Sequence, residues 1–153
     1  MTLTTNAPIH ATFTIERDYP QPIAKVFAAF SDVQTKRRWF AEGEGFSVRE
    51  YALDFREGGV EHYAFVAPDG SEGRNATVYL DIVPRERIVS AYTMDYAGAR
   101  ISSSLLTITF AAHGAGTRLT LTEQGYYLAN SDGPAGREAG SRELLDALAV
   151  ALG

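Results

Sequence analysis

The sequence predicts an α+β domain in which a curved antiparallel sheet of about seven strands wraps around a long C-terminal helix. Seven segments alternate apolar and polar residues, as half-buried strands do. Most of these segments are joined by short turns rich in Gly, Pro and Asp, which favours antiparallel pairing of neighbours. Helical periodicity is confined to a short region after the first strand and to the C-terminus. The 153 residues fit one domain, residues 1–153.

The first strand and a helix pair open the chain. Residues 10–17 alternate, with Ala11, Phe13 and Ile15 on one side. Pro22 suits the first turn of a helix, because its missing N–H would be unpaired there anyway. Apolar residues at helical spacing follow, and Ser31 or Asp32 can cap a second short helix that ends near residues 39–40.

Six further strands are expected before the last helix. Their predicted ranges are 46–55, 60–67, 75–83, 88–96, 101–111 and 117–126. Within the third, Val78, Leu80 and Ile82 should share one face. The final helix should be capped by Asp132 and continue to Leu152.

Composition excludes several classes of site. The formal net charge is −5, and the longest basic run is 36–38, which we expect to be the solvated face of a helix. Nucleic-acid binding is therefore not expected. The chain has no cysteine and its three histidines are scattered, so we expect no disulfide, no metal and no cofactor. The run 102–104 of three serines is expected to be a polar strand face.

Targeting signals are also absent from the sequence. Residues 1–10 contain no basic start followed by an apolar run, so we expect no signal peptide. No apolar stretch is long enough to span a membrane. These observations predict a cytoplasmic protein, and a homodimer is compatible with them.

A ligand cavity is suggested by the start of the last helix. Gly136 and Gly140 lie four residues apart and so on one face. Each glycine within a helix costs roughly 0.5–1 kcal/mol relative to alanine, which calls for a reason. Tight packing on the sheet, fraying of the helix start, or a pocket beneath it would each supply one.

Strand parity gives the candidate lining of that pocket. The apolar and aromatic residues expected to line it are Phe46, Tyr63, Phe65, Tyr92, Met94 and Leu106. Trp39 ends the helix pair near the predicted mouth, as a lid or as a core plug. Glu123 continues the side of Leu119 and Leu121, and a buried carboxylate must find a partner or a proton. The alternative is that the strand is ending there, with Glu123 partly exposed or paired with an arginine. The nearest acid–base candidates are Glu61 and His62, and no catalytic signature assigns a reaction to any of them.

A family resemblance emerges from motifs that cover nearly the whole chain. They occupy residues 13–17, 22–30, 39–40, 54–59, 68–70, 80–89 and 117–123. In this order they resemble the START-like, or SRPBCC, superfamily, and within it the branch named after the activator of heat-shock-protein ATPase. The resemblance implies a helix-grip fold with a deep hydrophobic cavity. Relatives include lipid and hormone carriers, polyketide cyclases and a co-chaperone, so the fold alone does not fix a function.

Three functional hypotheses follow. The first is the binding of a small hydrophobic or amphipathic molecule in an internal cavity. The second is a cyclase- or dehydratase-type enzyme in which Glu123, His62 or Glu61 moves protons. The third is a protein-interaction module that contacts a chaperone. The eukaryotic co-chaperone carries an additional N-terminal domain that drives ATPase stimulation, and these 153 residues contain no counterpart of it.

Overall fold

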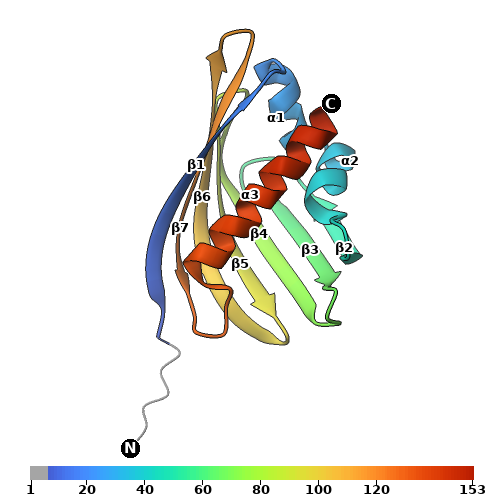
Figure 1. Ribbon diagram of the computed structural model, residues 1–153, viewed down its shortest axis with the longest axis vertical. Helices are drawn as coiled ribbons and strands as arrows, with labels where there is room; N and C mark the ends of the chain where they lie inside the picture. The colour runs from blue at the N-terminus through green and yellow to red at the C-terminus, as the bar shows by residue number, and fades with distance from the viewer. Residues whose placement is uncertain (1–6) are drawn as a thin grey trace, which may run out of the picture.

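A computed structural model describes residues 7–153. Residues 1–6, on which part of the signal-peptide expectation rests, lie outside the described residues. Seven antiparallel strands form one sheet in the order β1-β7-β6-β5-β4-β3-β2, which confirms the predicted α+β fold (Figure 1). The strands are β1 (Ile9–Tyr19), β2 (Ser47–Leu53), β3 (Val60–Val66), β4 (Glu72–Val83), β5 (Arg87–Tyr96), β6 (Ala99–His113) and β7 (Gly116–Tyr127).

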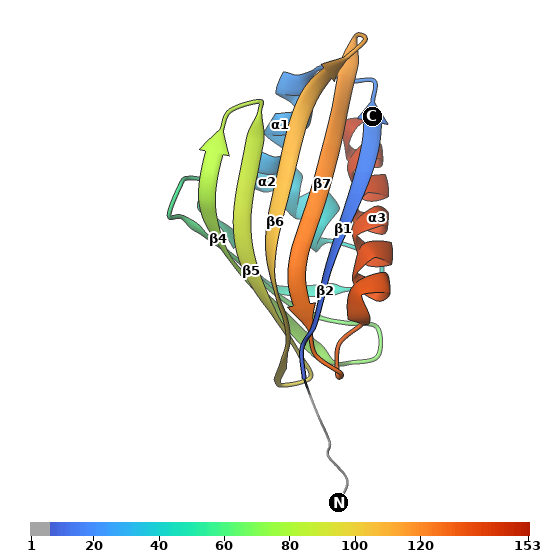
Figure 2. The same ribbon diagram turned by 90° about the vertical axis from the view of Figure 1, so that its left-hand side faces the viewer.

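The helices all lie on one face of the sheet. They are α1 (Ile23–Ser31), α2 (Val33–Lys36), the π-helical turn η1 (Arg37–Ala41) and α3 (Gly133–Leu152). Because β1 and β2 are the two edges of the sheet, the α1–η1 segment has to cross from one edge to the other. Helix α3 runs diagonally over the same face (Figures 1 and 2). The helix-grip architecture is therefore as the sequence predicts.

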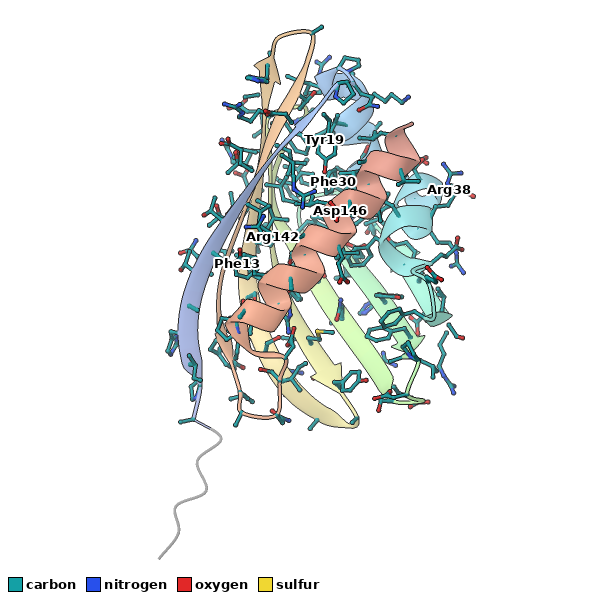
Figure 3. The ribbon with its side chains drawn as sticks, viewed as in Figure 1. Phe13, Tyr19, Phe30, Arg38, Arg142 and Asp146 are labelled. Carbon is teal, nitrogen blue, oxygen red and sulfur yellow. The ribbon has the colours of Figure 1, made fainter. Side chains whose placement is uncertain are left out.

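A solid core fills the half of the molecule near β1. Helix α1 and the second half of α3 pack there against β1, β6 and β7, with Ile15, Leu119, Leu145 and Leu148 almost fully buried. The Tyr19 hydroxyl donates to the backbone oxygen of Leu145 at 2.9 Å and ties the edge strand to the helix (Figure 3). Burial on this scale is the main stabilising contribution to such a fold.

A separate aromatic cluster occupies the other half, beneath η1. Its buried members are Ala41, Tyr63, Phe65 and Ala67. A cavity separates this cluster from α3.

The expected faces of β4 are wrong in part. Val78 and Leu80 are 41% and 51% exposed on the outer face, whereas Tyr79 between them is buried at 3%. The register shifts between Tyr79 and Asp81, so an irregularity at Leu80 returns Ile82 to the inner side, where it packs on the core. A bulge inverts strand parity locally, and sequence alternation alone does not show it.

The described helices include none with the length and apolar character needed to cross a membrane. The segment predicted as one strand at 46–55 is shorter in the structure: Phe46 precedes β2, and Phe55 follows it. Both rings still face inward, where Phe55 contacts Tyr79 and Phe46 contacts Phe65.

Candidate functional site

A cavity of about 610 Å³ lies between the inner face of the sheet and the helices. Strands β3 to β7 supply its floor, and η1 with the part of α3 between Arg137 and Ala147 supplies its roof. This volume lies within the range of roughly 300–1,000 Å³ that is usual for small-molecule sites.

The residues predicted to line a ligand site do line this cavity, with one exception. Those that line it are Trp39, Phe46, Tyr63, Phe65, Tyr92, Met94, Leu106, Glu123 and Gly140. The exception is Gly136, which is exposed and whose Cβ, if present, would meet the side chain of Asp132 at 3.1 Å. A Cβ at Gly140, in contrast, would have no atom within 4 Å. Only the second of the two helix glycines therefore borders open space.

Trp39 is a wall of the cavity and is packed as a core residue. Its indole is 5% exposed, packs edge-on against Phe30, and donates its N–H to the backbone oxygen of Ala29 at 2.9 Å. The sequence left two roles open for Trp39, a lid or a buried core residue, and in the structure it is packed as a buried core residue.

Stacked aromatic rings form the wall at the β3 end. Tyr63 and Phe65, two residues apart on one face, stack with centroids 4.9 Å apart, and Phe46 meets Phe65 edge-on at 5.5 Å. The Tyr63 hydroxyl donates to the oxygen of Ala41 at 2.6 Å. Burial raises the pKa of Tyr63 to about 12. The surface formed by these rings is thus apolar, and its one hydroxyl is already hydrogen-bonded.

A buried ion pair occupies the same wall. The ammonium of Lys36 donates to Glu61 Oε1 at 2.8 Å, and the two residues are 8% and 3% exposed. The hydroxyls of Tyr51 and Tyr79 each donate to the same carboxylate at 2.6 Å. The basic run at 36–38 is therefore not simply a solvated face. Helical geometry turns Lys36 inward, while Arg38 points away from the sheet (Figure 3).

Charge in this cluster is held on Glu61. Burial alone would raise the pKa of Glu61, but the Lys36 ammonium and the donated hydrogen bonds outweigh it, so the pKa lies below its ordinary value. Burial and the nearby Glu61 charge raise the pKa of Tyr79 and of Tyr51. The cluster is consequently an ionised carboxylate surrounded by protonated donors.

A second polar cluster centres on Glu123, which is 1% exposed. Its carboxylate accepts from Tyr92 at 2.8 Å, Ser104 at 2.8 Å and Tyr127 at 2.6 Å. Arg137 of α3 lies 3.5 Å from the same carboxylate. The sequence-based expectation of an inward carboxylate at Glu123 therefore holds in the structure.

Arg137 connects the helix to this cluster. It donates to the Tyr92 hydroxyl at 2.8 Å, to Ser102 at 2.9 Å, and to both oxygens of Asp132 at 2.9 and 3.0 Å. Asp132 makes no side-chain cap, because its carboxylate is taken up by this fork. Ser102 and Ser104 share a polar face of β6 that is turned toward the interior, where both are buried.

His62 lies on the opposite face of the sheet. It neighbours Glu61 and Tyr63 in β3, and adjacent strand residues point to opposite sides, so it does not reach the cavity. Among residues 7–153 there is no group of three or more His, Cys, Asp or Glu side chains placed to hold a metal ion.

Sequence reasoning missed Lys36, Tyr51, Tyr79 and Arg137. Lys36 and Arg137 have ordinary surface residues beside them in the chain, so their direction depends on helix phase. The sequence does contain one indication that Arg137 faces the sheet. It lies between Gly136 and Gly140, the glycines that suggested a pocket, and it follows Asp132 by five residues.

Comparison with known proteins shows close relatives of the same architecture. The family model for Activator of Hsp90 ATPase homolog 1-like protein matches residues 20–153. An uncharacterized protein from Rhizobium leguminosarum is 41% identical, with a TM-score of 0.90 and coverage of 95% of this chain and 96% of that one. A protein from Rhizobium loti is 46% identical, with a TM-score of 0.87 over 95% and 99% of the two chains. An AHSA1-like protein from Aeromonas hydrophila shares 23% identity and the fold, with a TM-score of 0.70 over 93% and 92%. No curated protein matches the chain.

Proposed function

This chain belongs to the family of Activator of Hsp90 ATPase homolog 1-like proteins, and we propose that it binds a small amphipathic organic molecule in the cavity beneath α3. The observation that carries the proposal is the cavity itself. Its aromatic wall and its two internally paired polar clusters would offer one guest both apolar contact and fixed hydrogen-bonding groups.

Energetics support a largely apolar guest. Burial of apolar surface contributes roughly 25 cal/mol per Å² removed from water. Rings of Phe40, Phe46 and Tyr63 offer such surface without further side-chain ordering, since they are already packed against one another or against Phe65. A preformed wall lowers the entropic cost of binding.

Thermal unfolding in the presence of candidate ligands tests the proposal. A ligand that binds only the folded state raises the melting temperature, and a screen of fatty alcohols, sterols and aromatic polyketides should contain such compounds. Gly140→Phe should abolish the shift, because the new ring would project into the space above the sheet. Ala139→Phe, on the exposed side of the same helix, is the matched control and should keep it. A screen without any shift in the unmodified protein would contradict the proposal.

A second candidate is an acid–base enzyme. It is favoured by one observation: each of two cavity carboxylates, Glu61 and Glu123, is hydrogen-bonded to tyrosine hydroxyls. Glu61 has a lowered pKa and hydrogen bonds to both of its oxygens, which make it a weak base, and this is why binding is the first proposal. If the protein turned over a ligand, and Glu61→Gln abolished that turnover while ligand binding persisted, the enzyme would become the first proposal and binding the second.

Contact with a chaperone would need an apolar outer surface. Val60, Val78 and Leu80 are exposed on the outer face of β3 and β4, with Val60 and Val78 paired across the two strands. A pull-down with purified chaperone, compared with Val78→Thr, would test this reading. Chaperone contact, a homodimer and a cytoplasmic location stay predictions from the sequence.

A further inference from the structure

We propose that the cavity takes a guest in which a ketone or ester carbonyl lies between two apolar arms, with the hydroxyls of Thr77 and Ser90 donating to that carbonyl. The inference rests on the proposed function and deepens it, since it names the chemical class of the guest. Two observations carry it. The floor of the cavity is polar at its centre and apolar at both ends, and two hydroxyls at that centre have no partner in the described part of the chain.

Strand β5 shows how the floor is divided. Its inward side chains are Ile88, Ser90, Tyr92 and Met94, and all four line the cavity. In this order they are apolar, polar, polar and apolar. At about 3.4 Å per strand residue, the two apolar ends lie roughly 20 Å apart. A guest that spans the floor therefore meets polar side chains near its middle.

The neighbouring strands continue this polar middle. The register places Thr77 of β4 opposite Tyr92, and Glu61 of β3 opposite Thr77. Tyr79 of β4 pairs with Ser90 in the same way. These five residues all line the cavity, and we call them the polar band. The band crosses three strands, so it separates the two apolar ends over much of the floor.

Each end offers an apolar surface to a guest. At one end Met94 packs against the ring cluster that contains Tyr63 and Phe65. At the other end Ile88 and the half-buried Leu106 line the cavity. Burial of apolar surface at either end stabilises the complex in proportion to the area removed from water. A guest with only one apolar arm forgoes this contribution at one end.

Three members of the polar band are already paired within the protein. The Tyr79 hydroxyl donates to Glu61 at 2.6 Å, and the other Glu61 oxygen also accepts a tyrosine hydroxyl. The Tyr92 hydroxyl donates to Glu123 and accepts from Arg137, at 2.8 Å in both cases. These groups shape the band without needing a partner on the guest.

Thr77 and Ser90 are different, because their hydroxyls are unpaired. Among residues 7–153 neither hydroxyl has a hydrogen-bond partner, and neither oxygen is sealed off from the cavity. The register makes them diagonal neighbours on the inner face, roughly 7 Å apart. A carbonyl oxygen above this pair can accept from either hydroxyl, which offsets the cost of desolvating them.

The position of these hydroxyls fixes the place of the carbonyl in the guest. A carbonyl oxygen has acceptor lone pairs only, so it brings no proton that would need a further partner in the band. A polar group at the end of a chain cannot carry an apolar arm on each side. The acceptor that fits both the hydroxyls and the two apolar ends is therefore an internal one.

Displacement of the fluorophore Nile red by two isomeric ketones tests the inference, because Nile red brightens in apolar surroundings. Tridecan-7-one carries equal arms on the two sides of its carbonyl, whereas tridecan-2-one carries one long arm and a methyl group. The isomers share one formula and nearly one hydrophobicity. Tridecan-7-one should bind about 3- to 10-fold more tightly, because the other isomer must give up the hydrogen bond or the contact at one end.

Variants of the two hydroxyl residues locate the site. Thr77→Val keeps the shape of the side chain and should reduce the preference between the isomers. The double variant Thr77→Val with Ser90→Ala should abolish it. Thr93→Val, on the outer face of β5, is the matched control and should keep the full preference. Circular dichroism checks that each variant is folded.

The outcomes separate this inference from the function on which it rests. Equal affinity for the two ketones in the unmodified protein, or a preference that the double variant retains in full, would overturn the inference. Displacement of Nile red by either ketone would then still support binding in the cavity. If neither Nile red nor a ketone binds, the proposed function fails, and the inference fails with it.

Discussion

At the scale of single residues, the Lys36–Glu61 pair is the most consequential contact in the cavity wall. Both side chains are almost wholly removed from water, and each charge is balanced chiefly by the other. Truncation of one partner leaves a buried charge without compensation, which costs far more than the net contribution of the intact pair.

Removal of the Lys36 charge should therefore destabilise the protein strongly. We expect Lys36→Met to lower the free energy of unfolding by about 3–5 kcal/mol, measured by urea denaturation. Arg38→Met, two residues along on the exposed side, should change it by less than about 0.5 kcal/mol. Adding Glu61→Gln to Lys36→Met should recover part of the loss. If Lys36→Met and Arg38→Met lowered the free energy of unfolding equally, Lys36 would not be buried as a charge.

The same pair predicts a pH dependence. The pKa of Glu61 is lower in the folded protein than its ordinary value of 4.5, so the unfolded chain binds more protons at acidic pH. The resulting stabilisation is fully present above the unfolded pKa and is lost as the pH falls toward the folded one. Melting temperatures measured from neutral to acidic pH should fall less steeply for Glu61→Gln than for the unmodified protein. Parallel curves would contradict this assignment.

Residue-level prediction from sequence succeeded where strand parity is regular, and it failed at the irregularity in β4 and where helix phase decides. Glu123 was placed inward because it continues the side of Leu119 and Leu121, and it is inward. Lys36 lies in a run of three cations in a short helical segment, and nothing local tells which of them turns toward the sheet. Its partner Glu61 is distant in the chain, so the pair exists only in three dimensions.

At the scale of elements, two glycines stand in opposite surroundings. Gly73 of β4 lies directly under the ring of Phe65, its partner in β3, and a Cβ there would overlap that ring. Gly140 of α3 borders open space instead. The same residue type thus serves close packing at one position and a void at the other, and sequence alone could not separate these two roles.

Alanine substitutions should separate them experimentally. Gly73→Ala should destabilise by about 1–3 kcal/mol, because Phe65 is stacked on Tyr63 and has little room to move. Gly140→Ala should stabilise by roughly 0.5–1 kcal/mol through helix propensity alone. Chemical denaturation of both variants checks the pair. A destabilised Gly140→Ala would mean that the roof of the cavity is closer than described.

Element boundaries and order were largely predictable, and one face was not. Turn residues such as Pro68 and Gly70 mark the chain reversals. The irregularity at Leu80 has no such marker, so alternation suggested Val78 and Leu80 as a shared face with Ile82. The buried residue is instead Tyr79, whose hydroxyl donates a hydrogen bond to the Glu61 carboxylate.

At the scale of the whole molecule, tyrosines are distributed through the interior. Burial raises the pKa of six of the eight: Tyr19, Tyr51, Tyr63, Tyr79, Tyr92 and Tyr127. For Tyr19 and Tyr63 the value is about 12. Since these residues belong to both halves of the fold, their ionisation is coupled to the integrity of the entire sheet.

Alkaline titration should consequently coincide with unfolding. A raised folded pKa contributes stability that is present below the unfolded value, near 10, and is lost as the pH rises through the folded value. Tyrosinate absorbance near 295 nm should rise steeply together with the loss of circular dichroism. Gradual ionisation of all tyrosines with the fold intact would contradict the burial of these rings.

The separation of a filled half from a hollow half has an evolutionary consequence. Some core residues, such as Leu119 and Leu148, do not line the cavity, and some cavity residues, such as Met94, lie outside that core, although Trp39 and Leu145 belong to both groups. Substitutions in the second group can reshape what the chamber accepts while the scaffold keeps its thermodynamic margin. New chemical preferences can therefore arise in this lineage by drift at a few positions, without first acquiring compensating changes elsewhere.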